Sequence, residues 1–197
     1  MKKTNKAYIP NNLELKGILA TTKEENLQRW TMLHLSYFSG LRAMEIAQLS
    51  ICEVYEGKEV RSMTQLQTKG GGVRRITLVD AELRSALTTW YEVQNLSTKS
   101  INAPLFTNPT GARFSSDGVV KQFIKAYSKF NEGKKPENKL KSHSGRRYFA
   151  TKLGNTPGIT TKQMMSLGGW ESPDVAMQYI ETNEEQLDDL VARAQLH

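Results

Sequence analysis

Cysteine and long hydrophobic runs are the features that this 197-residue chain most clearly lacks. Its single cysteine, Cys52, excludes an internal disulfide and any metal site built from several cysteines. No apolar run approaches the roughly 20 residues that a membrane-spanning helix needs. The N-terminus is basic, but no apolar segment follows it, so we expect neither a secretory signal nor a membrane partner. A reducing cytoplasm is the simplest compartment that fits these absences.

The composition that remains is typical of a globular protein. Hydrophobic residues make up 38% of the chain and charged residues 24%, which places it outside the disordered and the membrane classes. A chain of this length buries roughly 70% of the surface that it exposes when unfolded, enough for a core of its own. We therefore expect one domain rather than two.

The net charge of +7 is unevenly distributed along the chain. Residues 121–152 hold eight lysines and two arginines against only two acidic residues, whereas residues 181–197 hold five acidic residues against one arginine. A basic region of this kind is typical of proteins that bind a polyanion such as nucleic acid. A solvated lysine face would give the same counts, so charge alone leaves both interpretations open.

Hydrophobic spacing predicts a mostly helical α+β fold with a small antiparallel sheet near the N-terminal side. The sheet comes from two extended segments, 60–67 and 73–79, which a run of three glycines joins. A short strand is expected at 105–107, before a turn. Serine caps and Ser172-Pro173 mark helix starts. The expected helices cover residues 13–20, 24–38, 41–49, 81–93, 115–127, 142–153, 160–167, a short one from 173, and 184–194.

Two pairs of residues place arginines where they can act together with another polar group. Arg42 and Glu45 lie three residues apart, as do His143 and Arg146, so the members of each pair share one face of a helix. The planar guanidinium can hold two non-bridging phosphate oxygens at once. Glu45 could orient Arg42, or a neighbouring histidine, through a charge-assisted hydrogen bond.

Three further residues complete the requirements for breaking a phosphodiester. Tyr179 can supply an attacking phenolic oxygen, and Trp170, nine residues earlier, can donate its indole N–H to a phosphate oxygen. Lys69 stands next to the glycine run, where it could swing over a substrate and protonate the leaving oxygen. The same glycines lack the lysine and serine or threonine that end a P-loop.

Each of these residues also has an ordinary structural interpretation when taken alone. Tyr179 and Trp170 would usually pack in a core, and His143 would usually cap a helix or lie on the surface. Arg42 and Glu45 would usually form a surface pair, and three glycines would usually form a hairpin turn. Their order and spacing together favour phosphoryl transfer on DNA without a metal.

Over residues 24–183 the chain resembles the catalytic domain of the tyrosine recombinases, the phage integrase family. That family carries a Gly-Leu-Arg-x-x-Glu motif, a lysine on a hairpin, a His-x-x-Arg motif followed by Ala-Thr, and a His or Trp nine residues before a tyrosine. These motifs match residues 40–45, Lys69, His143 with Arg146 and residues 150–151, and Trp170 with Tyr179. Lys58 and several arginines near Lys69 leave the lysine assignment open.

The resemblance implies a mechanism and a set of partners. Tyr179 would form a 3′-phosphotyrosyl link with double-stranded DNA and require neither metal nor ATP. Arg42, Arg146, His143 and Trp170 would hold the phosphate, Lys69 would act as general acid and Glu45 would support Arg42. Accessory DNA-bending proteins are further possible partners. We expect phosphate contacts from the basic region, at Lys121, Lys125, Lys134, Lys135, Lys139, Lys141 and Arg147.

The expected organisation is an N-terminal extension (1–23), a catalytic domain (24–183) and a C-terminal helical tail (184–197). In the family such a tail packs into a neighbouring protomer and links a tetramer on DNA, whereas an isolated chain could fold it back on its own core. Family members carry an N-terminal DNA-clamping domain of about a hundred residues. Its absence from this sequence fits either a naturally short member or a catalytic fragment.

One departure from the family pattern concerns packing, and two other functions remain open. Ser144-Gly145 stands where the family usually has an apolar residue before the arginine, so we expect a local change in packing there. A type IB topoisomerase-like nicking and closing enzyme would use a similar site. A DNA-binding regulator on a degenerate recombinase domain is the third interpretation, and the filled catalytic positions argue against it.

Overall fold

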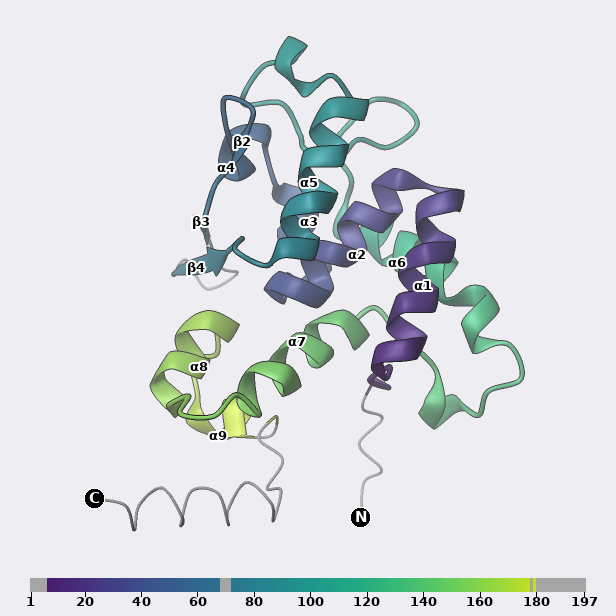
Figure 1. Cartoon of the computed structure of the whole chain (residues 1–197), viewed down its shortest axis with the longest axis vertical. Coiled ribbons are helices and arrows are strands. Elements are labelled where there is room, and N and C mark those ends of the chain that lie inside the picture. The colour runs from purple at the N-terminus through teal and green to yellow at the C-terminus, as the bar shows by residue number, and fades with distance from the viewer. Residues whose placement is uncertain (1–6, 68–71, 178, 180–197) are drawn as a thin grey trace. The chain divides into compact units, whose positions relative to one another are not determined.

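The computed structural model describes residues 7–67, 72–177 and 179 (Figure 1). The chain divides into two compact units, Met1–Phe149 and Ala150–His197. The first unit carries most of the helices and all the strands of the described ranges. None of the helices within those ranges is long and apolar enough to cross a membrane.

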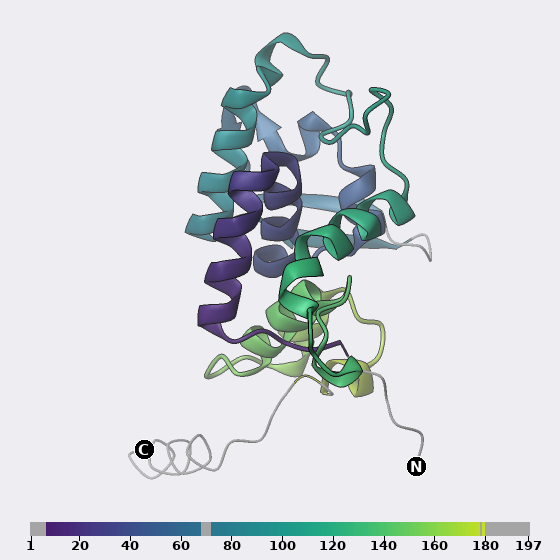
Figure 2. The same ribbon diagram turned by 90° about the vertical axis from the view of Figure 1, so that its right-hand side faces the viewer.

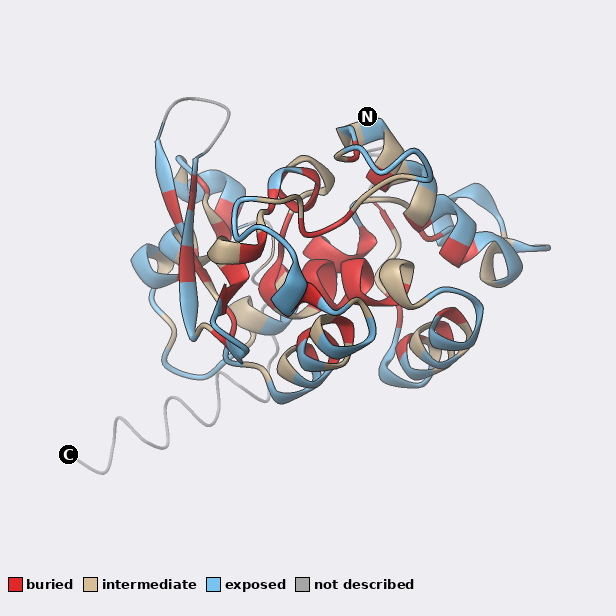
Figure 3. Ribbon diagram, turned by 90° about the horizontal axis from the view of Figure 1, so that it is seen from above, coloured by how far each residue is buried: buried red, intermediate tan, exposed pale blue. Residues whose placement is uncertain are grey.

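The first unit is built around α2 (Leu27–Ser39), in which every residue from Trp30 to Tyr37 is buried. The side chain of Asn26 caps its N-terminus by accepting a hydrogen bond from the backbone N–H of Arg29, at 2.8 Å. Three helices pack against α2 and cover its apolar surface (Figure 2): α1 (Asn12–Glu25), α5 (Ala81–Val93) and α6 (Ser116–Asn131). Figure 3 shows the buried residues gathered on the inner sides of these helices.

Short elements connect these helices. They are α3 (Ala43–Gln48), α4 (Ile51–Val54), the two-residue strands β1 (Tyr55–Glu56) and β2 (Glu59–Val60), and the 3-10 turns η1 (Leu96–Thr98) and η2 (Pro136–Asn138). The main hairpin pairs β3 (Met63–Gln67) with β4 (Val73–Thr77) in antiparallel register, so that Leu66 faces Arg74. In both strands every second residue is buried. The hairpin therefore turns one face to the core and the other to solvent.

The second unit has a small core of its own. The unit comprises the end of α7 (Ser144–Gly154) together with α8 (Thr161–Gly168) and α9 (Pro173–Met177). Thr160 and Gln163 form a capping box at the start of α8. The buried side chains are Ala150, Met164, Trp170 and Ala176.

The prediction of a mostly helical α+β fold is confirmed, and differences lie in the bounds of the first two helices and in the short elements. The helix expected at 13–20 continues to Glu25, and the helix expected from residue 24 begins at Leu27, because Asn26 caps it. The sheet comprises two separate hairpins, because residues 55–60 pair on their own before β3 begins. The strand expected at 105–107 is wrong: only isolated bridges form there, between Thr107 and Arg113 and between Ser50 and Pro104. A bridge of one residue satisfies few backbone groups, so the segment continues as a loop. The helix predicted over 184–194 lies outside the described residues.

Candidate active site

The turn between α2 and α3 determines where Arg42 stands. Gly40 ends α2 with a φ of 65°, in the left-handed region that favours glycine. A Cβ on Gly40 would also collide with the ring of Phe149. Leu41, 1% exposed, then anchors the turn in the core, and Arg42 takes the N-cap position of α3. The Gly-Leu-Arg order thus has a structural reason at each position.

Glu45 holds both the backbone and the side chain of Arg42. Its Oε2 accepts the Arg42 backbone N–H at 2.7 Å, and its Oε1 accepts Nη1 of the guanidinium at 2.9 Å. The Glu45 side chain is only 2% exposed, whereas that of Arg42 is 34% exposed. A buried carboxylate therefore orients an arginine that remains partly open to solvent.

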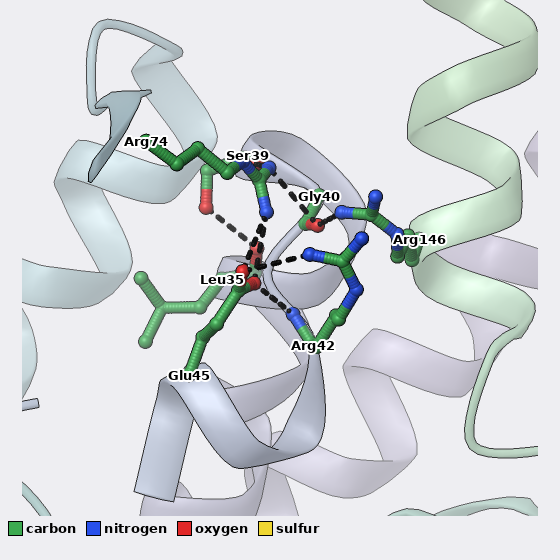
Figure 4. A network of polar contacts seen from close by, with 7 residues as sticks. All are labelled: Leu35, Ser39, Gly40, Arg42, Glu45, Arg74 and Arg146. Carbon is green, nitrogen blue, oxygen red and sulfur yellow. Dashed lines mark hydrogen bonds and ion pairs between the residues drawn. The ribbon is translucent and has the colours of Figure 1, made fainter. Parts of the chain in front are cut away.

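Arg74 is a third member of this cluster that the sequence did not reveal (Figure 4). Its Nη1 donates to both carboxylate oxygens of Glu45, at 3.0 and 2.8 Å, and its side chain is 1% exposed. The available signal was the alternation of the apolar residues Ile76 and Leu78 within the expected strand at 73–79. Two residues earlier on the same face, that alternation places Arg74 inside the molecule.

These arginines keep Glu45 ionised. Burial alone would raise the pKa of Glu45, but the charges of Arg74, Arg42 and Arg146 and the backbone N–H of Arg42 hold the pKa below its usual value. The cluster therefore contains a carboxylate surrounded by guanidinium groups at neutral pH.

Arg146 and His143 come from the start of α7. Arg146, 6% exposed, donates Nη1 to the carbonyl oxygen of Gly40 at 2.7 Å, which joins it to the turn that positions Arg42. His143 remains exposed. Partial desolvation and the positive charges of Arg146 and Arg42 lower the pKa of its imidazole. His143 is thus neutral at pH 7, able to donate or accept a hydrogen bond.

At Ser144-Gly145, where we expect a change in packing, the backbone lies close to α2. Both residues are buried, and a Cβ on Gly145 would lie 2.5 Å from Oγ of Ser36 and 3.1 Å from the ring of Tyr37. Glycine therefore lets the backbone of α7 approach α2 closely at the residue just before Arg146.

Trp170 and Tyr179 meet within the second unit. Their rings stack with centroids 5.1 Å apart and an interplanar angle of 25°. Trp170 is 8% exposed, and Tyr179 is half-buried. A Cβ on Gly154, in the last turn of α7, would stand 2.8 Å from the carbonyl oxygen of Tyr179, so this glycine leaves room for the tyrosine's backbone.

The candidate catalytic residues therefore fall into two groups within the described ranges. Arg42, Glu45, Arg146 and His143 belong to the first unit, whereas the stacked tryptophan and tyrosine belong to the second. Lys69, the expected general acid, lies outside the described residues. Nowhere in the described ranges do three or more His, Cys, Asp or Glu side chains gather as they would around a metal ion.

The seven basic residues expected to bind DNA are not equivalent. Four are exposed, namely Lys121, Lys125, Lys135 and Lys139, and Lys141 is half-buried. Lys134 instead pairs with Glu14 at 2.9 Å and lies over the ring of Tyr8. Arg147 donates to the carbonyl of Ala7. Lys134 and Arg147 thus make contacts that stabilise the fold.

Solved structures that resemble this chain include those of recombinases and integrases. The crystal structure of XerA recombinase matches with a TM-score of 0.71 at 20% identity, over 96% of this chain and 66% of that one. The Tn1549 transposon integrase in complex with circular intermediate DNA matches at 0.72 and 17%, over 98% and 68%. A lambda integrase dimer bound to a core site matches at 0.67 and 17%, over 93% and 62%. The chain thus spans about two thirds of each relative's length.

The sequence itself gives the family. A search of curated proteins finds no match. The sequence model of the phage integrase family, by contrast, matches residues 11–186. Since that match covers most of the sequence, the chain belongs to the phage integrase family.

Proposed function

We propose that this protein is a site-specific DNA recombinase whose Tyr179 forms a 3′-phosphotyrosyl link with double-stranded DNA. The observation that carries the proposal is the Arg42–Glu45–Arg146 cluster, because it gathers guanidinium groups around one buried turn in a member of the integrase family. Relatives of the same fold, among them XerH recombinase, have been solved bound to their DNA substrates. Residues 24–183 are the proposed catalytic domain.

The proposed reaction conserves the number of phosphodiester bonds. Tyr179 gives up its phenolic proton to solvent, and its oxygen attacks the scissile phosphorus. The bond to the 5′ oxygen breaks, and Lys69 protonates that oxygen to give a 5′-hydroxyl. A 5′-hydroxyl from a partner duplex then attacks the phosphotyrosine, and the tyrosine leaves. Because the covalent link retains the phosphoester bond, the cycle consumes no ATP.

The remaining residues stabilise charge on the phosphate. Arg42 and Arg146 bind its non-bridging oxygens, where preorganised donors are worth most in the transition state. Neutral His143 and the indole N–H of Trp170 donate further hydrogen bonds. Glu45 keeps Arg42 in one orientation, so that little reorganisation is needed when substrate arrives.

A covalent trap tests the proposal directly. Nicked suicide duplexes with a random-sequence pool are incubated with the protein, and a protein–DNA adduct is sought on a denaturing gel. Tyr179→Phe should abolish the adduct, whereas Tyr91→Phe, at a half-buried tyrosine of α5, should leave it unchanged. No adduct from the unmodified chain, with DNA binding intact, would favour a DNA-binding regulator. Adducts that religate only to their own strand would favour a topoisomerase-like enzyme.

We also propose that residues 184–197 link protomers into a tetramer on DNA. The apolar stripe of this segment follows directly after the proposed nucleophile: Leu187, Leu190, Val191 and Ala194. The segment lies outside the described residues, so the proposal rests on the sequence. Truncation after Asn183 should weaken assembly on DNA, and unchanged cleavage together with unchanged assembly would rule the idea out.

A further inference from the structure

We propose that Arg74 is a positioning residue for strand cleavage, which acts through Glu45 to hold and support the guanidinium of Arg42. The inference rests on the proposed function, since it assigns Arg74 to the same phosphate site. Arg74 comes from β4, whereas Arg42 and Glu45 belong to the start of α3. Figure 4 shows the two guanidinium groups converging on one carboxylate.

The contacts make Glu45 a shared acceptor. Its Oε1 accepts from Nη1 of Arg42 at 2.9 Å and from Nη1 of Arg74 at 3.0 Å. Its Oε2 accepts from the Arg42 backbone at 2.7 Å and from Arg74 at 2.8 Å. With donors on both oxygens, the carboxylate has one stable orientation, and that orientation determines where Arg42 points.

The charges explain why a second arginine is useful here. A carboxylate that orients Arg42 also cancels the positive charge that Arg42 offers to a phosphate. Glu45 is buried, so this cancellation is poorly screened by water. Arg74, which is equally buried, balances the carboxylate and leaves the cluster with the net positive charge that the phosphate requires.

Arg74 also approaches the turn that carries the site. Its Nη2 lies 3.4 Å from the carbonyl oxygen of Gly40, the atom to which Arg146 donates at 2.7 Å. The buried side chain of Arg74 therefore contacts both Glu45, which orients Arg42, and the Gly40 carbonyl, which holds Arg146. A planar guanidinium can span these acceptors, whereas the single ammonium of lysine cannot.

The first test compares neighbouring arginines of one strand. Arg75 follows Arg74 in β4 and is exposed on the opposite face, so Arg75→Met is a matched control. The probe is a nicked suicide duplex, selected from a random pool by covalent capture on the unmodified 197-residue chain. Arg74→Met should slow adduct formation on the order of 100-fold, the scale of a small misplacement of a catalytic group, with DNA affinity close to that of the unmodified chain. Equal rates for the two variants would overturn the proposal.

The second test asks whether Arg74 acts through Arg42. Replacing one non-bridging oxygen of the scissile phosphate by methyl removes the charge that an arginine neutralises, and the two diastereomers remove different oxygens. The diastereomer that restores cleavage to Arg42→Ala should also restore it to Arg74→Met. Restoration by the diastereomer that rescues Arg146→Ala would overturn the proposal, because Arg74 would then act at the other oxygen. Restoration by neither diastereomer would also overturn it, because a defect in folding alone does not respond to the charge of the phosphate.

Two controls separate this inference from folding and from the proposed function. Arg74→Lys keeps the buried charge and is examined in parallel, with circular dichroism to verify the fold of each variant. It should cleave at an intermediate rate with the same response to the diastereomers. If Arg74→Met does not fold, a wild-type rate in Arg74→Lys overturns the proposal. Failure of the unmodified chain to form any adduct would instead reject the proposed recombinase.

Discussion

The ring of Trp170 stacks on that of Tyr179 at a centroid distance of 5.1 Å. An aromatic neighbour restricts the tyrosine side chain to few orientations, and the indole adds an N–H donor close by. The two contributions can be separated, because one depends on ring surface and the other on a polar hydrogen. Ring stacking and N–H donation both come from the side chain of Trp170, which is 8% exposed.

Two replacements of Trp170 should therefore differ in cleavage activity. Trp170→Phe keeps a stacking ring but removes the donor, and we expect a loss of about 100-fold in the rate of adduct formation, the scale of one oxyanion donor. Trp170→His keeps an N–H on a smaller ring and should retain more activity. Single-turnover cleavage of a suicide duplex measures both. A phenylalanine variant as active as the histidine variant would show that stacking, not donation, matters.

Gly154 should be required for the position of Tyr179. A Cβ there would stand 2.8 Å from the tyrosine carbonyl oxygen and 3.1 Å from Cε of Met164, so Gly154→Ala must displace one of them. We expect slower cleavage and a free energy of unfolding lower by about 1–3 kcal/mol, as for overpacked sites. Denaturant unfolding and the covalent trap provide the two measurements.

Gly17 in α1 is the matched control for that change. It too lies in a helix, but among the described residues a Cβ there would meet only the ring of Phe130, at an ordinary contact distance of 3.6 Å. Gly17→Ala should therefore raise the free energy of unfolding by roughly 0.5–1 kcal/mol, because alanine favours helix, and leave cleavage unchanged. Similar losses of stability in both variants would contradict the steric argument.

His34 should make the protein sensitive to mild acid. Burial lowers its pKa to about 4, although its hydrogen bond to the Trp30 carbonyl opposes the shift. The unfolded chain takes up this proton near pH 6.5 and the folded chain near 4, so stability is intact above 6.5 and falls as the pH drops between these values. The loss between pH 7 and pH 5 should be about 2 kcal/mol.

His34→Phe isolates this effect. The replacement keeps a ring beside Trp30 and Phe38 but cannot bind a proton, so its free energy of unfolding should change less between pH 7 and pH 5. His143, whose pKa is also lowered, remains in both proteins and cancels in the difference. Glu45 contributes only below its ordinary pKa of 4.5, outside this window. Parallel pH profiles of the two proteins would contradict the prediction.

The sequence predicts best those features that depend on neighbours along the chain. The helix over 81–93 is found with those bounds, and Ser115 caps α6, because apolar spacing and a capping side chain act within a few residues. Pro173 starts α9 for the same local reason. The spacing of His143 and Arg146 likewise brings both to the start of one helix.

What the sequence did not reveal depends on contacts between distant segments. Arg74 is joined to Glu45 across 29 positions. The local alternation of the strand can place its side chain on the inner face, but it does not indicate the buried carboxylate that pairs with it. The close approach at Gly145 depends on Ser36, a residue of another helix. Lys134 carries the same charge as its neighbours, but its pairing with Glu14 joins residues 120 positions apart.

That pairing leads to the last prediction, on DNA affinity. Lys121 and Lys125 lie exposed one turn apart on α6, so both can contact phosphates. Each such contact releases counterions, so changing both to glutamine should reduce the slope of log affinity against log salt by about 2. Fluorescence anisotropy of a labelled duplex over a salt series measures that slope.

Lys134→Gln provides the contrast, because it removes one positive charge from the same basic region. Its ammonium already binds Glu14 at 2.9 Å, so little of its charge is left for DNA. We expect the salt slope to stay close to that of the unmodified chain, with a loss of stability below about 1 kcal/mol, since the pair is partly exposed. If net charge alone governed binding, each lysine would reduce the slope equally. A slope that falls half as much for Lys134→Gln as for the double variant of Lys121 and Lys125 would therefore show that the ion pair opens when DNA binds.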